Sequence, residues 1–303
     1  MGPLAFQFPG QGSQYVGMGK DLADRFLAAA RVFAEADEAL GFPLSRLCFE
    51  GPAEELNDTA NAQPAILTVS VAALRVLEER GERPACVAGH SVGEFAALVA
   101  AGALTFADAL GVVRERGRLM REAGQANPGG MAAVLGLEAD RVAALCREVT
   151  AAVGRPVGVA NDNCPGQVVI SGDEEALRAA IEAAQAAGAR RVVRLAVSVA
   201  AHSPLMAEAA AAFRQALARV RLGPPRVPFI ANATAEVMTD PEAIREALAR
   251  QLTSPVRWRE SLRRMLEMEV SRFVEVGPGE VLTGLVRRMG VPVQALTTAQ
   301  ALG

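Results

Sequence analysis

Apolar positions follow two different patterns along the first part of the chain. Short runs of consecutive apolar residues predict buried strands over residues 4–8 and 85–88. Elsewhere apolar residues recur every three or four positions, which is the spacing of amphipathic helices. This spacing predicts helices over residues 21–40, 64–80, 95–101 and 106–122. Strands that alternate with helices indicate an α/β fold, in which helices cover a largely parallel sheet.

A different order of elements begins after the loop Asn127-Pro128-Gly129-Gly130. Here the pattern predicts strands over residues 131–137, 157–160, 167–171 and 191–197, and helices over residues 138–149 and 174–187. Residues 161–166, between the second and third of these strands, predict a turn. The resulting order, βαββαβ, is that of a ferredoxin-like unit.

The first pattern then resumes, so the ferredoxin-like unit is an insertion. Further elements are predicted as helices over residues 204–220, 241–251, 258–269 and 280–288, and strands over residues 227–231 and 271–276. We therefore expect a core built from residues 1–127 and 199–303, and a small subdomain over residues 128–198.

Composition and charge exclude several classes of protein. The 303 residues carry a net charge of −3 and only 4% aromatic residues, which argues against a nucleic-acid partner. Residues 1–8 do not resemble a signal peptide, and the apolar stretch 95–104 is too short to span a bilayer. We expect no membrane association and a cytoplasmic location. With two histidines and four widely separated cysteines, we expect no metal site.

The pentapeptide Gly89-His90-Ser91-Val92-Gly93 lies between a predicted strand and a predicted helix. A Gly-x-Ser-x-Gly sequence in this position is typical of a nucleophile elbow, which makes Ser91 the candidate nucleophile. A serine needs a base, and the tight turn directs the neighbouring His90 elsewhere, so His202 is the candidate base. Of the acids between them, neither Asp162 nor Asp173 is well placed for a triad. A backbone carbonyl or an amide is the alternative partner of the histidine.

Arg116 does not match its predicted helix. The residues three and four positions away on either side are all apolar: Val112, Val113, Leu119 and Met120. A charge on an apolar face needs an anionic partner, and a guanidinium suits a carboxylate bidentately. The partner is either a carboxylate of the protein, as a structural ion pair, or a carboxylate of the substrate.

Several motifs in a fixed order carry a resemblance to a known family. They are Phe8-Pro9-Gly10-Gln11-Gly12-Ser13-Gln14, Gly89-His90-Ser91-Val92-Gly93-Glu94, Arg116-Gly117, Asn163-Cys164-Pro165-Gly166-Gln167-Val168-Val169, Val197-Ser198 with His202-Ser203-Pro204-Leu205-Met206, Gln251 before Ser254-Pro255-Val256-Arg257-Trp258, and Glu275-Val276-Gly277-Pro278-Gly279. Together they resemble the malonyl-CoA:acyl carrier protein transacylase family over nearly the whole chain. The resemblance implies an α/β-hydrolase-like core that carries a ferredoxin-like subdomain.

The resemblance also implies roles for individual residues. Ser91 and His202 are expected as nucleophile and base, and Arg116 as the residue that binds the malonyl carboxylate. The backbone N–H groups of Gln11 and Val92 are expected to form an oxyanion hole. The main chain of Gln251 is expected to orient the histidine, which explains the missing acid.

The implied partners are malonyl-CoA and an acyl carrier protein, in fatty acid or polyketide synthesis. We expect neither a metal nor a redox cofactor, and we expect a monomer. Ala201 stands where many malonyl-selective relatives have Phe, so this smaller residue of the substrate pocket leaves room for α-substituted malonyl groups. The alternatives are the transacylase of a malonate decarboxylase, a thioesterase or serine hydrolase, and a non-catalytic docking scaffold.

Overall fold

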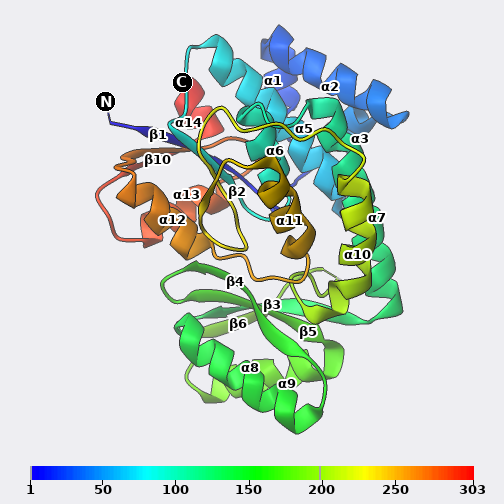
Figure 1. Cartoon of the computed structure of the whole chain (residues 1–303), viewed down its shortest axis with the longest axis vertical. Coiled ribbons are helices and arrows are strands. Elements are labelled where there is room, and N and C mark those ends of the chain that lie inside the picture. The colour runs from blue at the N-terminus through cyan, green and yellow to red at the C-terminus, as the bar shows by residue number, and fades with distance from the viewer. Residues whose placement is uncertain (1, 198) are drawn as a thin grey trace.

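The computed structural model describes residues 2–197 and 199–303. Within these residues the larger sheet has six strands in the order β10-β9-β1-β2-β7-β8. They are β1 (Leu4–Phe8), β2 (Cys86–Gly89), β7 (Phe229–Ile230), β8 (Val237–Met238), β9 (Arg272–Glu275) and β10 (Gln294–Thr297). All neighbouring strands are parallel except β7 and β8. The carboxyl ends of β1 and β2 therefore lie side by side, which brings the loops after them together (Figure 1).

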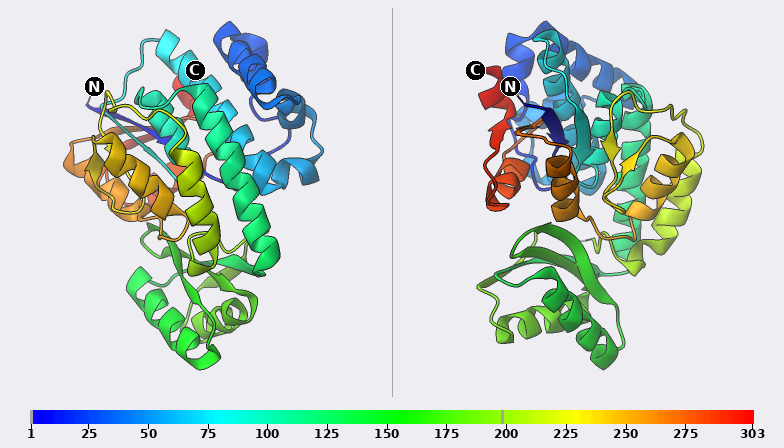
Figure 2. Two further views of the ribbon diagram at one scale, coloured as in Figure 1. Left: turned by 45° about the vertical axis from the view of Figure 1, so that its right-hand side comes forward. Right: turned by 60° about the vertical axis from the view of Figure 1, so that its left-hand side comes forward.

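A separate antiparallel sheet has the strand order β4-β5-β3-β6. Its strands are β3 (Gly129–Leu135), β4 (Val157–Cys164), β5 (Gln167–Asp173) and β6 (Arg191–Arg194). The helices α8 (Ala139–Val153) and α9 (Glu174–Ala186) cover its outer face, and Figure 2 shows the other face turned toward the larger body. The predicted α/β class and the inserted βαββαβ order are confirmed. We keep 128–198 as the proposed extent of the small subdomain.

Helices cover both faces of the larger sheet. The helices outside the small subdomain are α1 (Lys20–Arg25), α2 (Leu27–Leu40), α3 (Leu44–Glu50), α4 (Ala53–Asn57), α5 (Thr59–Glu79), α6 (Gly93–Ala100), α7 (Phe106–Ala126), the 3-10 helix η1 (Pro204–Met206), α10 (Ala207–Leu217), α11 (Pro241–Gln251), α12 (Trp258–Glu267), α13 (Val281–Arg288) and α14 (Thr298–Leu302). Phe6 and Phe8 belong to the apolar cluster that contains α5, α6 and α7, whereas Ala5 belongs to the cluster of α12 and α13. This alternation follows from the period of two of a strand.

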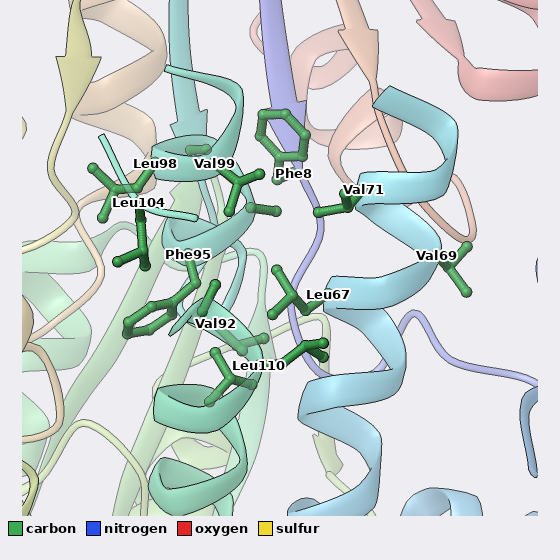
Figure 3. Packing of buried hydrophobic residues seen from close by; sticks show 14 of the residues in the cluster. Phe8, Leu67, Val69, Val71, Val92, Phe95, Leu98, Val99, Leu104 and Leu110 are labelled. Atoms are coloured by element: carbon green, nitrogen blue, oxygen red, sulfur yellow. The ribbon is translucent and has the colours of Figure 1, made fainter. Parts of the chain in front are cut away.

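The long helix α5 is the centre of the larger core. Among the described helices it alone has the length and hydropathy of a membrane span, and 89% of that window is buried inside the protein. Its Leu67 and Val71 point toward Phe8 of β1 and toward side chains of α6 and α7 (Figure 3). The apolar length of α5 is thus used to hold the sheet and the two helices together.

Two predicted helices differ from the observed ones at identifiable residues. The predicted helix over 21–40 is interrupted at Phe26, whose backbone is extended (φ −131°, ψ 119°). The guanidinium groups of Arg25 and Arg80 lie 5.1 and 5.4 Å from the ring of Phe26, contacts that stabilise it in this position. The predicted helix over 64–80 begins earlier, at Thr59, because the side chain of Asp58 caps it.

The predicted turn over residues 161–166 is wrong for its first four residues. β4 continues to Cys164 because this segment pairs with β5. On its other side, Asp162 N donates to Val256 O at 3.0 Å, and Val256 N donates to Ala160 O at 2.8 Å. These two bonds tie the small sheet directly to the larger body. The short elements α3, α4, β8, β10 and α14 have no counterpart among the predicted elements, because they are too short to show a period.

Candidate active site

Ser91 lies on a sharp turn between β2 and α6. Its φ of 53° is in the left-handed region, which costs a non-glycine residue about 1–3 kcal/mol. Glycine is required on both sides of it. A Cβ atom on Gly89 would lie 1.9 Å from the carbonyl carbon of Gly93, and one on Gly93 would lie 2.1 Å from Phe8 O. The Gly-x-Ser-x-Gly sequence is therefore the local requirement for a turn this tight.

Ser91 and His202 meet across 111 positions of sequence. Ser91 Oγ lies 2.9 Å from His202 Nε2. His202 Nδ1 lies 2.8 Å from Gln251 O and 3.1 Å from Ser254 O. Because both of these partners can only accept, Nδ1 carries the proton and Nε2 is free to accept one from the serine hydroxyl. The other histidine, His90, points elsewhere: its Nε2 lies 2.9 Å from Asn163 Oδ1.

The environment keeps His202 neutral. Burial lowers the pKa of His202, and the nearby charge of Arg116 lowers it further, to about 3. No acid assists the histidine among the described residues: Asp173 instead caps α9, and Asp162 accepts no hydrogen bond from His202. The site is thus a serine–histidine pair oriented by main-chain carbonyls.

Arg116 lies beneath the nucleophile and is 1% exposed. Its Nη2 donates to Ser91 Oγ at 3.0 Å and to Gln251 Oε1 at 2.7 Å, and its Nη1 donates to Gln63 Oε1 at 2.6 Å. Its Nε has no hydrogen-bond partner in the described part of the chain. Burial lowers the pKa of Arg116 to about 10, and the charge of Glu94 opposes this shift. At neutral pH the guanidinium is therefore charged.

The alternative of a structural ion pair for Arg116 is not supported. All its hydrogen-bond partners are neutral, and it forms no ion pair with a carboxylate of the described residues. Arg118, on the exposed face of the same helix, is instead paired at 2.6 Å with both Glu115 and Glu122. A buried cation beside the nucleophile, with neutral partners and one unused donor, is suited to bind an anionic group.

Gln251 connects these groups. Its main-chain oxygen accepts from His202, and its side-chain oxygen accepts from Arg116. Its Nε2 donates to Ser91 O at 3.0 Å and also to the carboxylate of Glu94. One buried glutamine therefore contacts the backbone of the nucleophile, the base and the guanidinium.

A cavity of about 100 Å³ opens beside these groups, between the larger body and the small sheet. Its lining is mostly apolar and comes from both parts: Met120, Met131, Leu195, Val197, Val199 and Ala201. Gln11, Ser91, Val92, Arg116 and His202 also line it. Among the described residues, neither Gln11 N nor Val92 N has a hydrogen-bond partner in the protein. Of the predicted motif at 197–198, Val197 lines the cavity and Ser198 lies outside the described residues.

The arrangement can be compared with known proteins. Residues 5–303 match the model of one protein family, described as the acyl transferase domain. This chain belongs to that acyl transferase family. The resemblance inferred from the motifs is thereby confirmed at the level of the family.

Individual relatives of this acyl transferase match it over almost its whole length. The malonyl CoA-acyl carrier protein transacylase of Bacillus subtilis (strain 168) is 49% identical over 289 residues, which are 95% of this chain and 91% of that protein. The enzyme of the same name from Escherichia coli (strain K12) is 48% identical over 290 residues, 95% of this chain and 93% of that one. A malonyl-transacylase solved with a type II polyketide acyl-carrier protein has a TM-score of 0.93 and 44% identity, covering 97% of this chain and 94% of that one.

Sequence reasoning missed three buried polar residues of this acyl transferase site: Gln63, Glu94 and Asn232. Gln63 bonds Arg116, and it connects through Thr59 Oγ1 to Gln11 Oε1, with both steps at 2.9 Å. Glu94 stands in an apolar helix, which is the same kind of signal that identified Arg116. Asn232 follows a two-residue strand and gives no such signal.

Proposed function

We propose that this acyl transferase moves a malonyl group from coenzyme A to the phosphopantetheine thiol of an acyl carrier protein, through an acyl-serine intermediate. One observation carries the proposal: the buried guanidinium of Arg116 is 3.0 Å from Ser91 Oγ and has only neutral partners among the described residues. A malonyl group on Ser91 has a free carboxylate at short reach of its ester. An acetyl group has none, so the guanidinium selects for the dicarboxylic acyl group.

In the first half-reaction Ser91 Oγ attacks the thioester carbon while His202 Nε2 takes the hydroxyl proton. The carbonyl π electrons move onto oxygen, and the N–H groups of Gln11 and Val92 donate to this oxyanion. A backbone donor of this kind is worth about 3–4 kcal/mol in the transition state. The intermediate then collapses: the C–S bond breaks, His202 returns its proton to the coenzyme A sulfur, and malonyl-Ser91 remains.

The second half-reaction runs the same steps in reverse order with a new thiol. His202 takes the proton of the phosphopantetheine thiol, and its sulfur attacks the malonyl ester. The bond from the acyl carbon to Ser91 Oγ breaks, and the serine regains the proton from His202. Since the base has a depressed pKa, it is deprotonated and ready for each new thiol at neutral pH.

The remaining predictions belong to this proposal. The proposed route needs neither a metal nor a redox cofactor, because the chain itself supplies the nucleophile, the base and the anion-binding groups. Fatty acid synthesis and polyketide synthesis both use this reaction, so the proposal covers both pathways. A monomer and a cytoplasmic location remain predictions. The four cysteines are free and buried, which suits a reducing compartment.

Intact-protein mass spectrometry with a panel of acyl-CoAs tests the proposal. We expect a malonyl adduct on Ser91 within one turnover, little acetyl adduct at equal concentration, and discharge on addition of a holo acyl carrier protein. The adduct must also survive in water until the thiol arrives. Rapid hydrolysis without a thiol would identify a thioesterase, and the absence of any adduct would support a non-catalytic protein.

A further inference from the structure

A buried asparagine spans the turn that carries the nucleophile. Asn232 is fully buried and follows β7, whose neighbour in the sheet is β2. Its side-chain oxygen accepts from Ser91 N at 2.6 Å, and its side-chain nitrogen donates to Gly89 O at 2.6 Å. The Asn232 amide thus bonds both Gly89, where the chain enters the turn, and Ser91, the residue with left-handed backbone angles. No other described side chain bonds both of these positions.

A buried carboxylate holds this asparagine from the other side of the turn. Glu94 is 2% exposed, and its Oε1 accepts from Asn232 N at 2.7 Å. Its second oxygen accepts from Gln251 Nε2. This bond fixes which way the Gln251 amide faces: the nitrogen lies toward Glu94 and Ser91 O, and the oxygen toward Arg116.

These contacts also determine the direction of one backbone donor. Ser91 O accepts from both Glu94 N and Gln251 Nε2, each at 3.0 Å. In a planar trans peptide the C=O and the following N–H point in opposite directions. Fixing Ser91 O therefore fixes the Val92 N–H, which borders the cavity and has no partner among the described residues.

We propose that Asn232 and Glu94 are positioning residues for acyl transfer, which hold the Ser91 turn and direct the Val92 N–H without contacting the substrate. Neither residue lines the cavity. The inference rests on the proposed function for the identity of the acyl group, but it applies to any acyl group carried by Ser91. Because the nucleophile and the oxyanion donor serve every acyl group, loss of Asn232 lowers loading of malonyl and acetyl groups by the same factor. Loss of the Glu94 carboxylate lowers both, and it lowers malonyl loading at least as much as acetyl loading, because Glu94 also orients Gln251 toward Arg116.

Asn232→Asp is the sharpest test because its effect depends on pH. When protonated, the new carboxyl group donates to Gly89 O and accepts from Ser91 N, as asparagine does. When ionised, it keeps only the acceptor and faces the carbonyl oxygen of Gly89. Glu94 accepts from Asn232 N, and burial raises the pKa of Glu94 to about 7, so this carboxylate titrates over the same range. The ratio is therefore taken without it: loading by the double variant Asn232→Asp/Glu94→Gln, divided by loading by Glu94→Gln at the same pH, is expected to rise as the pH falls from 8 to 6.

Asn232→Ala and Glu94→Gln test the same assignment without a titration. In Glu94→Gln one of the two acceptor oxygens becomes an NH₂ group that faces either Asn232 N or Gln251 Nε2, whichever way the amide turns. For both variants we expect the single-turnover rate constant of Ser91 loading to fall about tenfold or more. The rate constant is measured rather than the amplitude, because a partly unfolded sample loses amplitude only.

Glu275→Gln is the matched control. Glu275 is another fully buried carboxylate with two N–H donors, Leu282 N at 3.1 Å and Thr283 N at 2.8 Å, but it lies outside the catalytic cavity. The Glu275→Gln substitution should lower the melting temperature and leave the rate constant of Ser91 loading unchanged. Wild-type rate constants in folded Asn232→Ala and Glu94→Gln, or a pH-independent ratio for Asn232→Asp/Glu94→Gln, would overturn the proposal. If wild type loads acetyl groups in preference to malonyl groups, the proposed function fails, while these ratios still test the positioning role.

Discussion

The two walls of the catalytic cavity differ in kind. The wall from the larger body carries Ser91, His202 and Arg116, whose side chains are hydrogen-bonded to one another and to Gln251. The wall from the small subdomain carries apolar side chains such as Met131 and Leu195, with Asn161 as its polar member. The comparison indicates that the larger body supplies the reactive and charged groups, whereas the small subdomain mainly supplies apolar surface that shapes the cavity. Substitutions in the two walls should therefore have different effects on the rate and the selectivity of acyl transfer.

The largest effect is expected at the dyad. Ser91→Ala should abolish covalent acylation, and His202→Ala should slow it by about 10²- to 10⁴-fold, because the hydroxyl loses its proton acceptor. Both are measured as the rate of malonyl-Ser91 formation by rapid-quench mass spectrometry. The melting temperature serves as the check on folding. Near-normal acylation of the His202 variant would contradict the assignment of the base.

The next effect distinguishes the two faces of α7. In Arg116→Ala the malonyl carboxylate becomes buried without its partner, at a cost of about 2–5 kcal/mol, or roughly 30- to several-thousand-fold in kcat/KM. Acetyl-CoA loses no such contact, so the malonyl-to-acetyl ratio of kcat/KM should collapse. Arg116→Lys should restore only part of the loss, since an ammonium cannot replace the planar fork.

Arg118→Ala is the control for this substitution, because Arg118 is exposed and paired with two carboxylates of its own helix. It should leave the ratio unchanged. An equal fall for both substrates in Arg116→Ala would mean that the arginine supports the structure and not the substrate.

The pH dependence should reveal the environment of His202. Its pKa in the folded protein lies below the ordinary value of 6.5, at about 3, so the base stays neutral well below pH 6. Because burial raises the pKa of Glu94 to about 7, the pH profile of acetyl loading is measured in Glu94→Gln, where loading should persist well below pH 6. Arg116→Ala removes one cause of the lowering and should shift the acid limb upward. The free energy of unfolding, in contrast to the loading rate, should fall over this range. Below pH 6.5 the unfolded chain binds a proton at His202 that the folded protein does not bind, so unfolding becomes easier as the pH falls. An acid limb at pH 6.5 in Glu94→Gln would contradict this environment.

A smaller effect is expected at Ala201, on the selectivity between malonyl and methylmalonyl groups. Ala201 is buried and lines the cavity, and we expect its small side chain to leave room for a substituent on the α-carbon of the acyl group. Methylmalonyl-CoA should load Ser91 measurably, and Ala201→Phe should suppress that loading by about 10- to 200-fold, the discrimination one methyl group allows. Unchanged methylmalonyl loading in this variant would remove Ala201 from the acyl pocket.

The smallest effect is expected on the rim. Acyl carrier proteins are expected to be acidic, and the exposed Arg190, Arg191, Arg287 and Arg288 are candidates for steering one. Arg288 donates to Gln167 at the start of β5, so this arginine lies where α13 meets the small sheet. Charge reversal should raise the carrier KM severalfold at low salt, with malonyl-CoA kinetics unchanged. Arg194, paired with Glu174, is the control, and unaltered carrier kinetics in every variant would exclude this surface.

The sequence predicted those parts of the site that depend on local rules. A serine between two glycines, and an arginine among apolar neighbours, are visible as patterns because strand-to-helix turns and helix faces impose them. Asn232 could not be found in this way, because its role depends on β7 lying beside β2 in the sheet. The same limit explains β4: residues 161–164 are rich in turn-forming side chains, and only the pairing with β5 and Val256 makes them a strand.

The burial of the cysteines has a practical chemical consequence. Burial raises the pKa of Cys48 and Cys86 to about 12 and that of Cys146 to about 11, and it also raises the pKa of Cys164. Since thiolates are the species that react with maleimides and haloacetamides, the native thiols should resist these reagents while the protein is folded. A cysteine introduced on the rim can then be cross-linked to a thiol-reactive carrier analogue in the wild-type background. Whether that rim position lies close to the bound carrier can then be tested without removing any native cysteine.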